Sequence, residues 1–131
     1  NKFAKYDKNV KSNGKLKKYI NLHEKYLKES KIFFQQKNYS QVSEKLWGAT
    51  ATLTKAIAAT RKKTINTHDG VGFYLASLFK ELKDKTILDI ISMANSMHQN
   101  FYEDNLPPEV IQRASQKIKQ FSHRIRAKFR I

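Results

Sequence analysis

Apolar residues recur at the three- and four-residue spacing of helices over five segments of the chain. In residues 16–34, Leu16, Ile20, Leu27 and Phe34 share one helix face. Similar stripes follow in residues 40–63, 71–82, 87–101 and 110–129. No segment sustains the alternation of apolar and polar residues that is typical of a strand. The pattern therefore predicts an all-α protein, an up-and-down four-helix bundle with one added helix, in which sequential helices pack antiparallel.

The breaks between these stripes carry capping, loop or helix-breaking residues. Residues 36–39 interrupt the period, and Ser40 is placed to cap the second helix. Residues 64–72 contain two glycines together with Asn and Asp, which predicts a loop. Pro107 and Pro108 end the fourth helix and can open the fifth, because proline is tolerated in a first helical turn.

The second predicted helix consists largely of small residues. Five alanines and Gly48 let neighbouring helices approach closely, so we expect this helix to be the most buried. Trp47 lies off the main apolar stripe, and we interpret it as a core or dimer-interface residue rather than a stacking platform. A helix with two apolar faces needs two neighbours, and a second protomer could be one of them, so a homodimer stays open.

Positive charge is concentrated at the two ends of the chain. The 131 residues carry 26 Lys and Arg against 11 Asp and Glu, a formal net charge of +15. Residues 1–31 hold ten Lys and three acidic residues, and residues 109–131 hold seven Lys or Arg beside Glu109 alone. The middle of the chain is nearly balanced. We therefore expect a polyanionic partner.

Length and composition indicate one domain with a basic extension. Residues 1–14 have a Lys at every third position and little to bury, which predicts a flexible basic arm. Residues 15–131 then form a single helical bundle domain with a basic last helix. The chain has no Cys and no apolar run long enough for a membrane span, so we expect a cytoplasmic protein.

The basic residues predict binding to phosphates. Each Lys or Arg that neutralises a phosphate releases counterions, which makes such binding favourable and sensitive to salt. We expect non-catalytic binding of RNA or of a ribonucleoprotein such as the ribosome, with DNA as an open alternative. The bundle needs the apolar stripe of the last helix for its own packing, so we do not expect this helix to lie on a membrane. The expected nucleic-acid-binding residues are Lys2, Lys5, Lys8, Lys11, Lys15, Lys17, Lys18, Arg61, Lys62, Lys63, Lys117, Lys119, Arg124, Arg126, Lys128 and Arg130.

Two sequence blocks carry a family resemblance. The first is E-K-L-W-G-A, residues 44–49, preceded by Ser43 in a polar helix start. The second is A-N-S-M-H-Q-N-F-Y-E, residues 94–103, with Met97 where the family has Leu. Together with His68 and Asp69 between them, these blocks resemble the archaeal PaREP family over roughly residues 20–105.

This resemblance implies a relation to the HEPN superfamily of small helical bundles, which are often dimeric and RNA-directed. Several HEPN proteins are metal-independent ribonucleases in which an Arg and a following His are separated by four to six residues. His98 matches the His, but no Arg or Lys lies between Lys85 and His98, which argues against the usual HEPN cleavage. Arg61 and His68 satisfy the spacing, yet they straddle a helix end and a loop.

Two alternatives to simple RNA binding stay open. One is a noncanonical HEPN ribonuclease or toxin that uses His98, and the other is a homodimeric interaction module of a toxin–antitoxin pair. We interpret His98 instead as a partly buried helix histidine, hydrogen-bonded beside Asn100 and Tyr102. His23 and His123 are expected to be structural or phosphate-facing. The sequence carries no motif for a metal site, a cofactor or a P-loop, so we expect none.

Overall fold

The computed structural model describes the backbone of residues 2–131 and the side chains of residues 14–131. Within these residues the chain forms helices and no strands. The helices are α1 (Lys2–Gln35), α2 (Tyr39–Thr60), α3 (His68–Leu82), α4 (Thr86–Glu103) and α5 (Pro108–Phe129). The all-α prediction is therefore confirmed, and the structure is a helical bundle.

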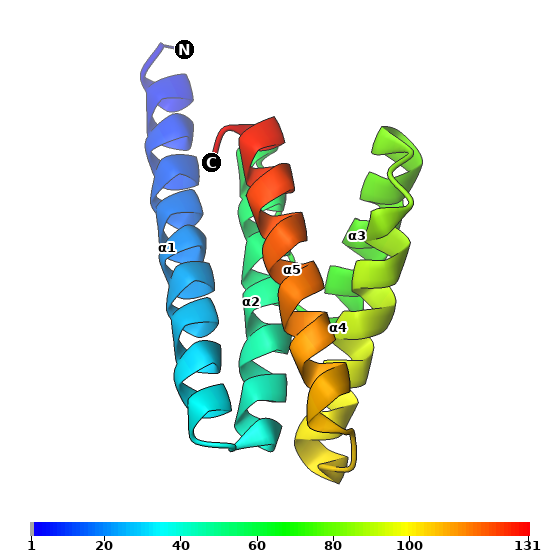
Figure 1. Ribbon diagram of the computed structural model, residues 1–131. Helices are drawn as coiled ribbons and strands as arrows, with labels where there is room; N and C mark the ends of the chain where they lie inside the picture. Colours follow the sequence, from blue (N-terminus) through cyan, green and yellow to red (C-terminus); the bar gives the residue numbers. More distant parts are fainter. Residues whose placement is uncertain (1) are drawn as a thin grey trace.

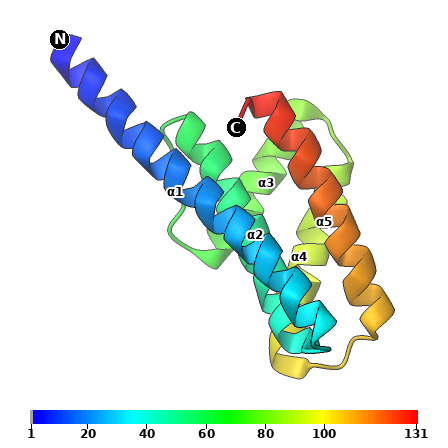
Figure 2. The same cartoon turned by 60° about the vertical axis from the view of Figure 1, so that its left-hand side comes forward.

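Helix α2 lies at the centre of this bundle. Helices α1, α4 and α5 surround it, and α3 lies at the far edge beside α4 (Figure 1). Figures 1 and 2 show α1, α2, α4 and α5 alternating in direction. The first turns of α1 extend beyond the other helices, as the turned view makes plain (Figure 2).

One predicted direction is wrong, because α2 and α3 run parallel rather than antiparallel. Arg61 at the end of α2 pairs with Glu81 at the end of α3, while Trp47 in the middle of α2 stacks on His68 at the start of α3. The connection of residues 61–67 is long enough to return along α2 before α3 begins, so the rule for short connections does not apply.

The first helix begins earlier than its apolar stripe predicts. Helix α1 starts at Lys2, not at Leu16, because polar residues with ordinary helix propensity continue the backbone hydrogen bonds beyond the packed stripe. Residues 1–14 were expected to form a flexible arm; their backbone is helical from Lys2 on, and the flexibility of the segment stays a prediction. The side chains of Lys2, Lys5, Lys8 and Lys11 lie outside the described residues, so their predicted phosphate contacts stay a prediction.

The glycines of this protein lie within helices, and residues with side chains follow the helix ends. All four glycines lie in helices, including Gly70 and Gly72, which the sequence assigned to a loop. The actual start of α3 is capped by Thr67, whose hydroxyl accepts a hydrogen bond from the Gly70 amide at 2.9 Å. Ser40 does not cap α2, since α2 already begins at Tyr39.

The core forms where α2 meets its neighbours. As predicted, α2 is deeply buried along most of its length, and Leu46, Leu53 and Ile57 are almost fully enclosed. Gly48 allows α1 to approach closely, because a Cβ there would lie 3.1 Å from the ring of Tyr26. Such close packing fixes α1 against α2.

A buried histidine joins three helices at the heart of the molecule. His23 of α1 is 0% exposed. Its Nδ1 lies 2.7 Å from the carbonyl oxygen of Ala49 on α2, and its Nε2 lies 2.6 Å from Oγ of Ser122 on α5. A carbonyl can only accept, so Nδ1 carries the proton and Nε2 accepts from the Ser122 hydroxyl. His23 is therefore a structural residue, not a phosphate-facing one.

Candidate functional site

Basic side chains from three helices gather at one end of the bundle. The N-terminal half of α1 and the C-terminal ends of α2 and α5 lie there (Figures 1 and 2). Lys15 donates a hydrogen bond to Oγ1 of Thr64 at 3.3 Å, and the guanidinium of Arg61 lies 5.0 Å from the Phe129 ring centre. We call this region the basic end, and its members are Lys15, Lys17, Lys18, Arg61, Lys62, Lys63, Lys128 and Arg130.

Backbone geometry places two of these cations at helix ends. Lys62 follows α2 and Arg130 follows α5, and both have the left-handed backbone that ends a helix, with φ of 60° and 55°. A positive charge at this position also complements the helix dipole. Part of the basic end therefore stabilises the helices that carry it.

Three of the predicted arginines are held by carboxylates. Arg61 donates two hydrogen bonds to Glu81, at 2.7 and 2.5 Å. Arg124 bonds to Asp84 at 2.9 Å and also to the hydroxyl of Thr86. The charges of these arginines are thus partly neutralised within the chain, and their predicted phosphate contacts stay a prediction.

The third paired arginine, Arg126, connects α5 to α1. It lies 3.1 Å from a carboxylate oxygen of Glu24, and its Nε donates to the backbone oxygen of Ile131 at 3.1 Å.

The hydrogen bonds from Arg61 hold the pKa of Glu81 below its usual range, and Lys63 and Lys128 lower it further. This shift places Lys63 and Lys128 in the electrostatic surroundings of the same carboxylate.

Two predicted lysines lie away from the basic end. Lys117 lines a hollow of about 350 Å³ with Arg113 and Arg124, between α4 and α5. Lys119 lies on another side of α5, next to α1. The predicted set is therefore divided, and its largest part is the basic end.

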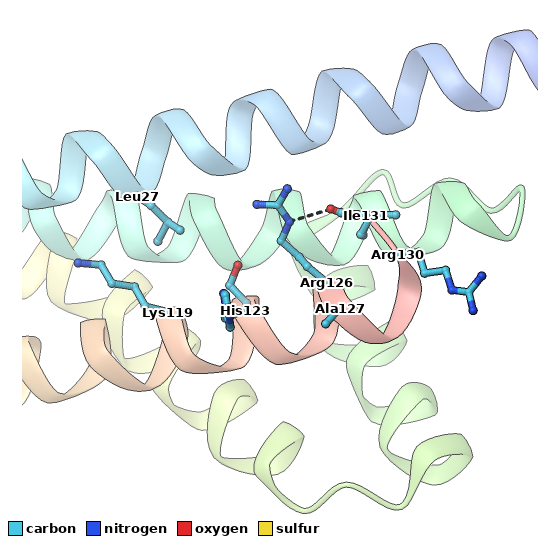
Figure 3. Close-up of a pocket in the computed structure, with 8 residues that line it drawn as sticks. Leu27, Lys119, His123, Arg126, Ala127, Arg130 and Ile131 are labelled. Atoms are coloured by element: carbon cyan, nitrogen blue, oxygen red, sulfur yellow. Dashed lines mark hydrogen bonds between the residues drawn. The ribbon is translucent and has the colours of Figure 1, made fainter.

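A groove follows the seam between α1 and α5. Its upper hollow, the part nearer the C-terminal end of α5, has a volume of about 590 Å³. It is lined by Leu27 of α1 and, on α5 and just after it, by Lys119, Ser122, His123, Arg126, Ala127, Arg130 and Ile131 (Figure 3). A second hollow of about 330 Å³ continues from Lys119 along the same two helices. We call the two together the seam groove. It was not predicted, because it depends on how far apart the two helices lie.

A cluster of aromatic and histidine rings occupies a different part of the molecule. The ring centres of His68 and His98 lie 4.8 Å apart, and Trp47 lies 5.3 Å from His68 and 5.1 Å from His98. Tyr102, 74% exposed, packs edge-on against His98 at 5.6 Å. We call these four residues the histidine cluster. Trp47 is half-buried against rings of its own chain.

The structure corrects the expected surroundings of His98. Asn100 does not bond to it but is itself buried, donating to Oγ of Ser43 at 2.8 Å and accepting from the amides of Asn105 and Leu106. His98 is half-buried, as expected, and its described neighbours are rings. Arg61 and His68 do not form a pair, since Arg61 binds Glu81 at the basic end while His68 stacks on Trp47.

The segments that form the histidine cluster and the Ser43–Asn100 contact lie within one family match. A model of the archaeal PaREP1/PaREP8 family matches residues 18–122. The chain belongs to this family. Comparison with curated proteins and with solved structures gave no match. The PaREP1/PaREP8 match confirms the resemblance that the two sequence blocks indicated.

The extent of the PaREP1/PaREP8 match separates the two candidate sites. The histidine cluster lies entirely inside it, whereas Lys15, Lys17, Lys128 and Arg130 of the basic end lie outside it. The match also spans helices α2, α3 and α4 completely. Half of the basic end therefore lies outside the part of the chain that the family model describes.

Sequence reasoning missed the histidine cluster, although a signal for it was present. Trp47 and His98 belong to the two blocks that resemble the PaREP family, and His68 lies in the third matching segment. Their meeting depends on the parallel course of α2 and α3, which was predicted wrongly. Within the described residues, no helix is long and apolar enough to cross a membrane, and no three potential metal ligands gather.

Proposed function

We propose that this protein binds RNA or a ribonucleoprotein through phosphate contacts made by the basic end, without cleaving it. The observation that carries this proposal is the convergence of lysines from three separate helices. Lys15 on α1 bonds to Thr64 in the connection after α2, while Lys63 of that connection and Lys128 on α5 act on the carboxylate of Glu81, the partner of Arg61. Charges from distant parts of the sequence that meet on one surface form a footprint for a polyanion.

RNA is favoured over DNA by the HEPN-like character that the family resemblance implies. We also propose that the fold is a HEPN-like bundle. Its four core helices would be α1, α2, α4 and α5, which alternate in direction, and α3 would be the added helix. The paired arginines support positioning rather than catalysis, because each already has a carboxylate partner that would compete with a phosphate.

A charge-removal experiment tests the proposal. The variant Lys15→Gln/Lys63→Gln/Lys128→Gln removes one cation from each of three elements. We expect its affinity for labelled ribosomal RNA to fall at least tenfold at moderate salt. The plot of log affinity against log salt should also become less steep by about 2, since each contact to a single strand contributes roughly 0.7.

A matched control removes the same charge elsewhere. Lys25, Lys28 and Lys37 are exposed, and they lie on α1 away from its start and in the connection after it. The variant Lys25→Gln/Lys28→Gln/Lys37→Gln should bind within threefold of the unchanged protein. Equal losses from the two triple variants, or no binding of the unchanged protein to RNA, would overturn the proposal.

The histidine cluster supports a second candidate function. Two histidines with rings 4.8 Å apart could divide the roles of general acid and general base in cleavage of an RNA strand beside a 2′-hydroxyl. Labelled RNA incubated with the protein tests this candidate. Cleavage that His98→Ala and His68→Ala each abolish, while RNA binding persists, would establish it, and intact RNA would exclude it.

A further inference from the structure

We propose that the seam groove between α1 and α5 holds a single strand of RNA, with its phosphates along α5. This inference rests on the proposed function and names the form of RNA that the protein would take. It depends on three properties of the groove: its length, its line of cations and its apolar floor.

The groove is elongated rather than round. Its two hollows share Lys119, and their linings on α5 run from Gln112 to Arg130. At about 1.5 Å per residue, these 18 steps along α5 correspond to about 27 Å. A small anion would occupy a fraction of that length, whereas several nucleotides of an extended strand would fill it.

Three cations and a histidine follow one side of the groove at helical spacing. Lys119, His123, Arg126 and Arg130 are separated by four, three and four residues, so they form one stripe on α5. Figure 3 shows them along the upper hollow, with Lys119 at one end and Arg130 at the other. Glu24 pairs with Arg126 from α1, and the stripe stays positive because Lys119 and Arg130 have no acidic partner among the described side chains.

The rest of the lining suits bases rather than a second phosphate backbone. Leu27 and Ala127 give the upper hollow an apolar floor, and Phe34, Gln112 and Gln116 line the lower one. Apolar surface and amide groups can contact the faces and edges of unpaired bases. In a duplex these edges are paired and the faces stacked, so the lining favours a single strand.

The test compares two RNA probes and two variants of the same helix. The probes are a labelled single-stranded oligonucleotide of twelve residues and the same oligonucleotide annealed to its complement. The groove variant is Lys119→Gln/His123→Gln, and both positions are exposed on α5. The matched control is Arg113→Gln, which likewise removes one formal positive charge, at an exposed position of α5 that lines the hollow on the α4 side.

We expect the unchanged protein to prefer the single strand at least tenfold. The groove variant should lose at least tenfold on the single strand and less than threefold on the duplex, while the control binds both as before. A groove variant that binds like the unchanged protein would overturn the inference. If the basic-end variant still lost affinity, the proposed function would stand without it.

Crosslinking supplies a second readout that does not depend on affinity. Because the chain has no Cys, His123→Cys and Arg113→Cys each introduce one position for a photoreactive label. Crosslinks to the single strand from position 123 and not from position 113 are expected. The reverse pattern would place the RNA elsewhere, and exclusive capture of an acidic helical peptide at position 123 would assign the groove to a protein partner.

Discussion

His23 makes the stability of this fold depend on pH near neutrality. Burial lowers the pKa of His23 below its usual 6.5; the hydrogen bond to Ala49 opposes this, and nearby Arg126 adds to it. Between the lowered value and 6.5, the unfolded chain binds a proton that the folded chain excludes. The free energy of unfolding therefore falls as pH decreases through this range.

We predict that the unchanged protein loses stability between pH 7.5 and pH 5.0 in urea unfolding experiments. The variant His23→Gln should be less stable at pH 7.5 and nearly independent of pH over this interval, since an amide does not titrate. The exposed His123→Gln should keep the pH dependence of the unchanged protein. An unaltered pH profile in His23→Gln would show that another group is responsible.

At the scale of elements, the helix ends use side chains where glycine is usual. Lys83 follows α3 with φ of 54°, and its amide bonds to the carbonyl of Phe79. For a residue with a Cβ, this left-handed backbone conformation costs about 1 kcal/mol of free energy, whereas glycine adopts it without that cost.

We therefore expect Lys83→Gly to raise the free energy of unfolding by about 1 kcal/mol. Lys80→Gly, three residues earlier inside α3, should lower it by about 1 kcal/mol because glycine is a poor helix former. Denaturant unfolding of the two variants measures both changes. A loss of stability in Lys83→Gly would show that its side chain contributes more than its backbone costs.

The elements also show what the sequence could predict. The apolar stripes located all five helices, because helical spacing reflects burial directly. The loop prediction for residues 64–72 failed at Gly70 and Gly72, where the Thr67 cap outweighed the glycines. The histidine cluster and the seam groove depend on the direction of α3 and the separation of α1 and α5, which local spacing does not encode.

At the scale of the whole molecule, a net charge of +15 opposes the folded state. Salt screens this repulsion, since the Debye length falls from about 30 Å at 0.01 M to about 8 Å at 0.15 M. We predict that the Tm rises with sodium chloride over this range in differential scanning fluorimetry.

The rise should be smaller in Lys25→Gln/Lys28→Gln/Lys37→Gln, which has three fewer positive charges. A Tm that falls with salt would instead mean that the ion pairs of Arg61, Arg124 and Arg126 outweigh the general repulsion. Those pairs are on or near the surface, where each usually contributes less than about 1 kcal/mol.

The bond between His23 and Ser122 also sets an order of assembly during synthesis. Its partners are 99 residues apart, and Ser122 belongs to α5, which leaves the ribosome after α1 and α2. The hairpin of α1 and α2 can form early from local contacts, with His23 already bonded to Ala49. Because Ser122 and the enclosure of Nε2 come from α5, we expect the newly made chain to acquire the pH sensitivity of His23 only after α5 has packed against this hairpin.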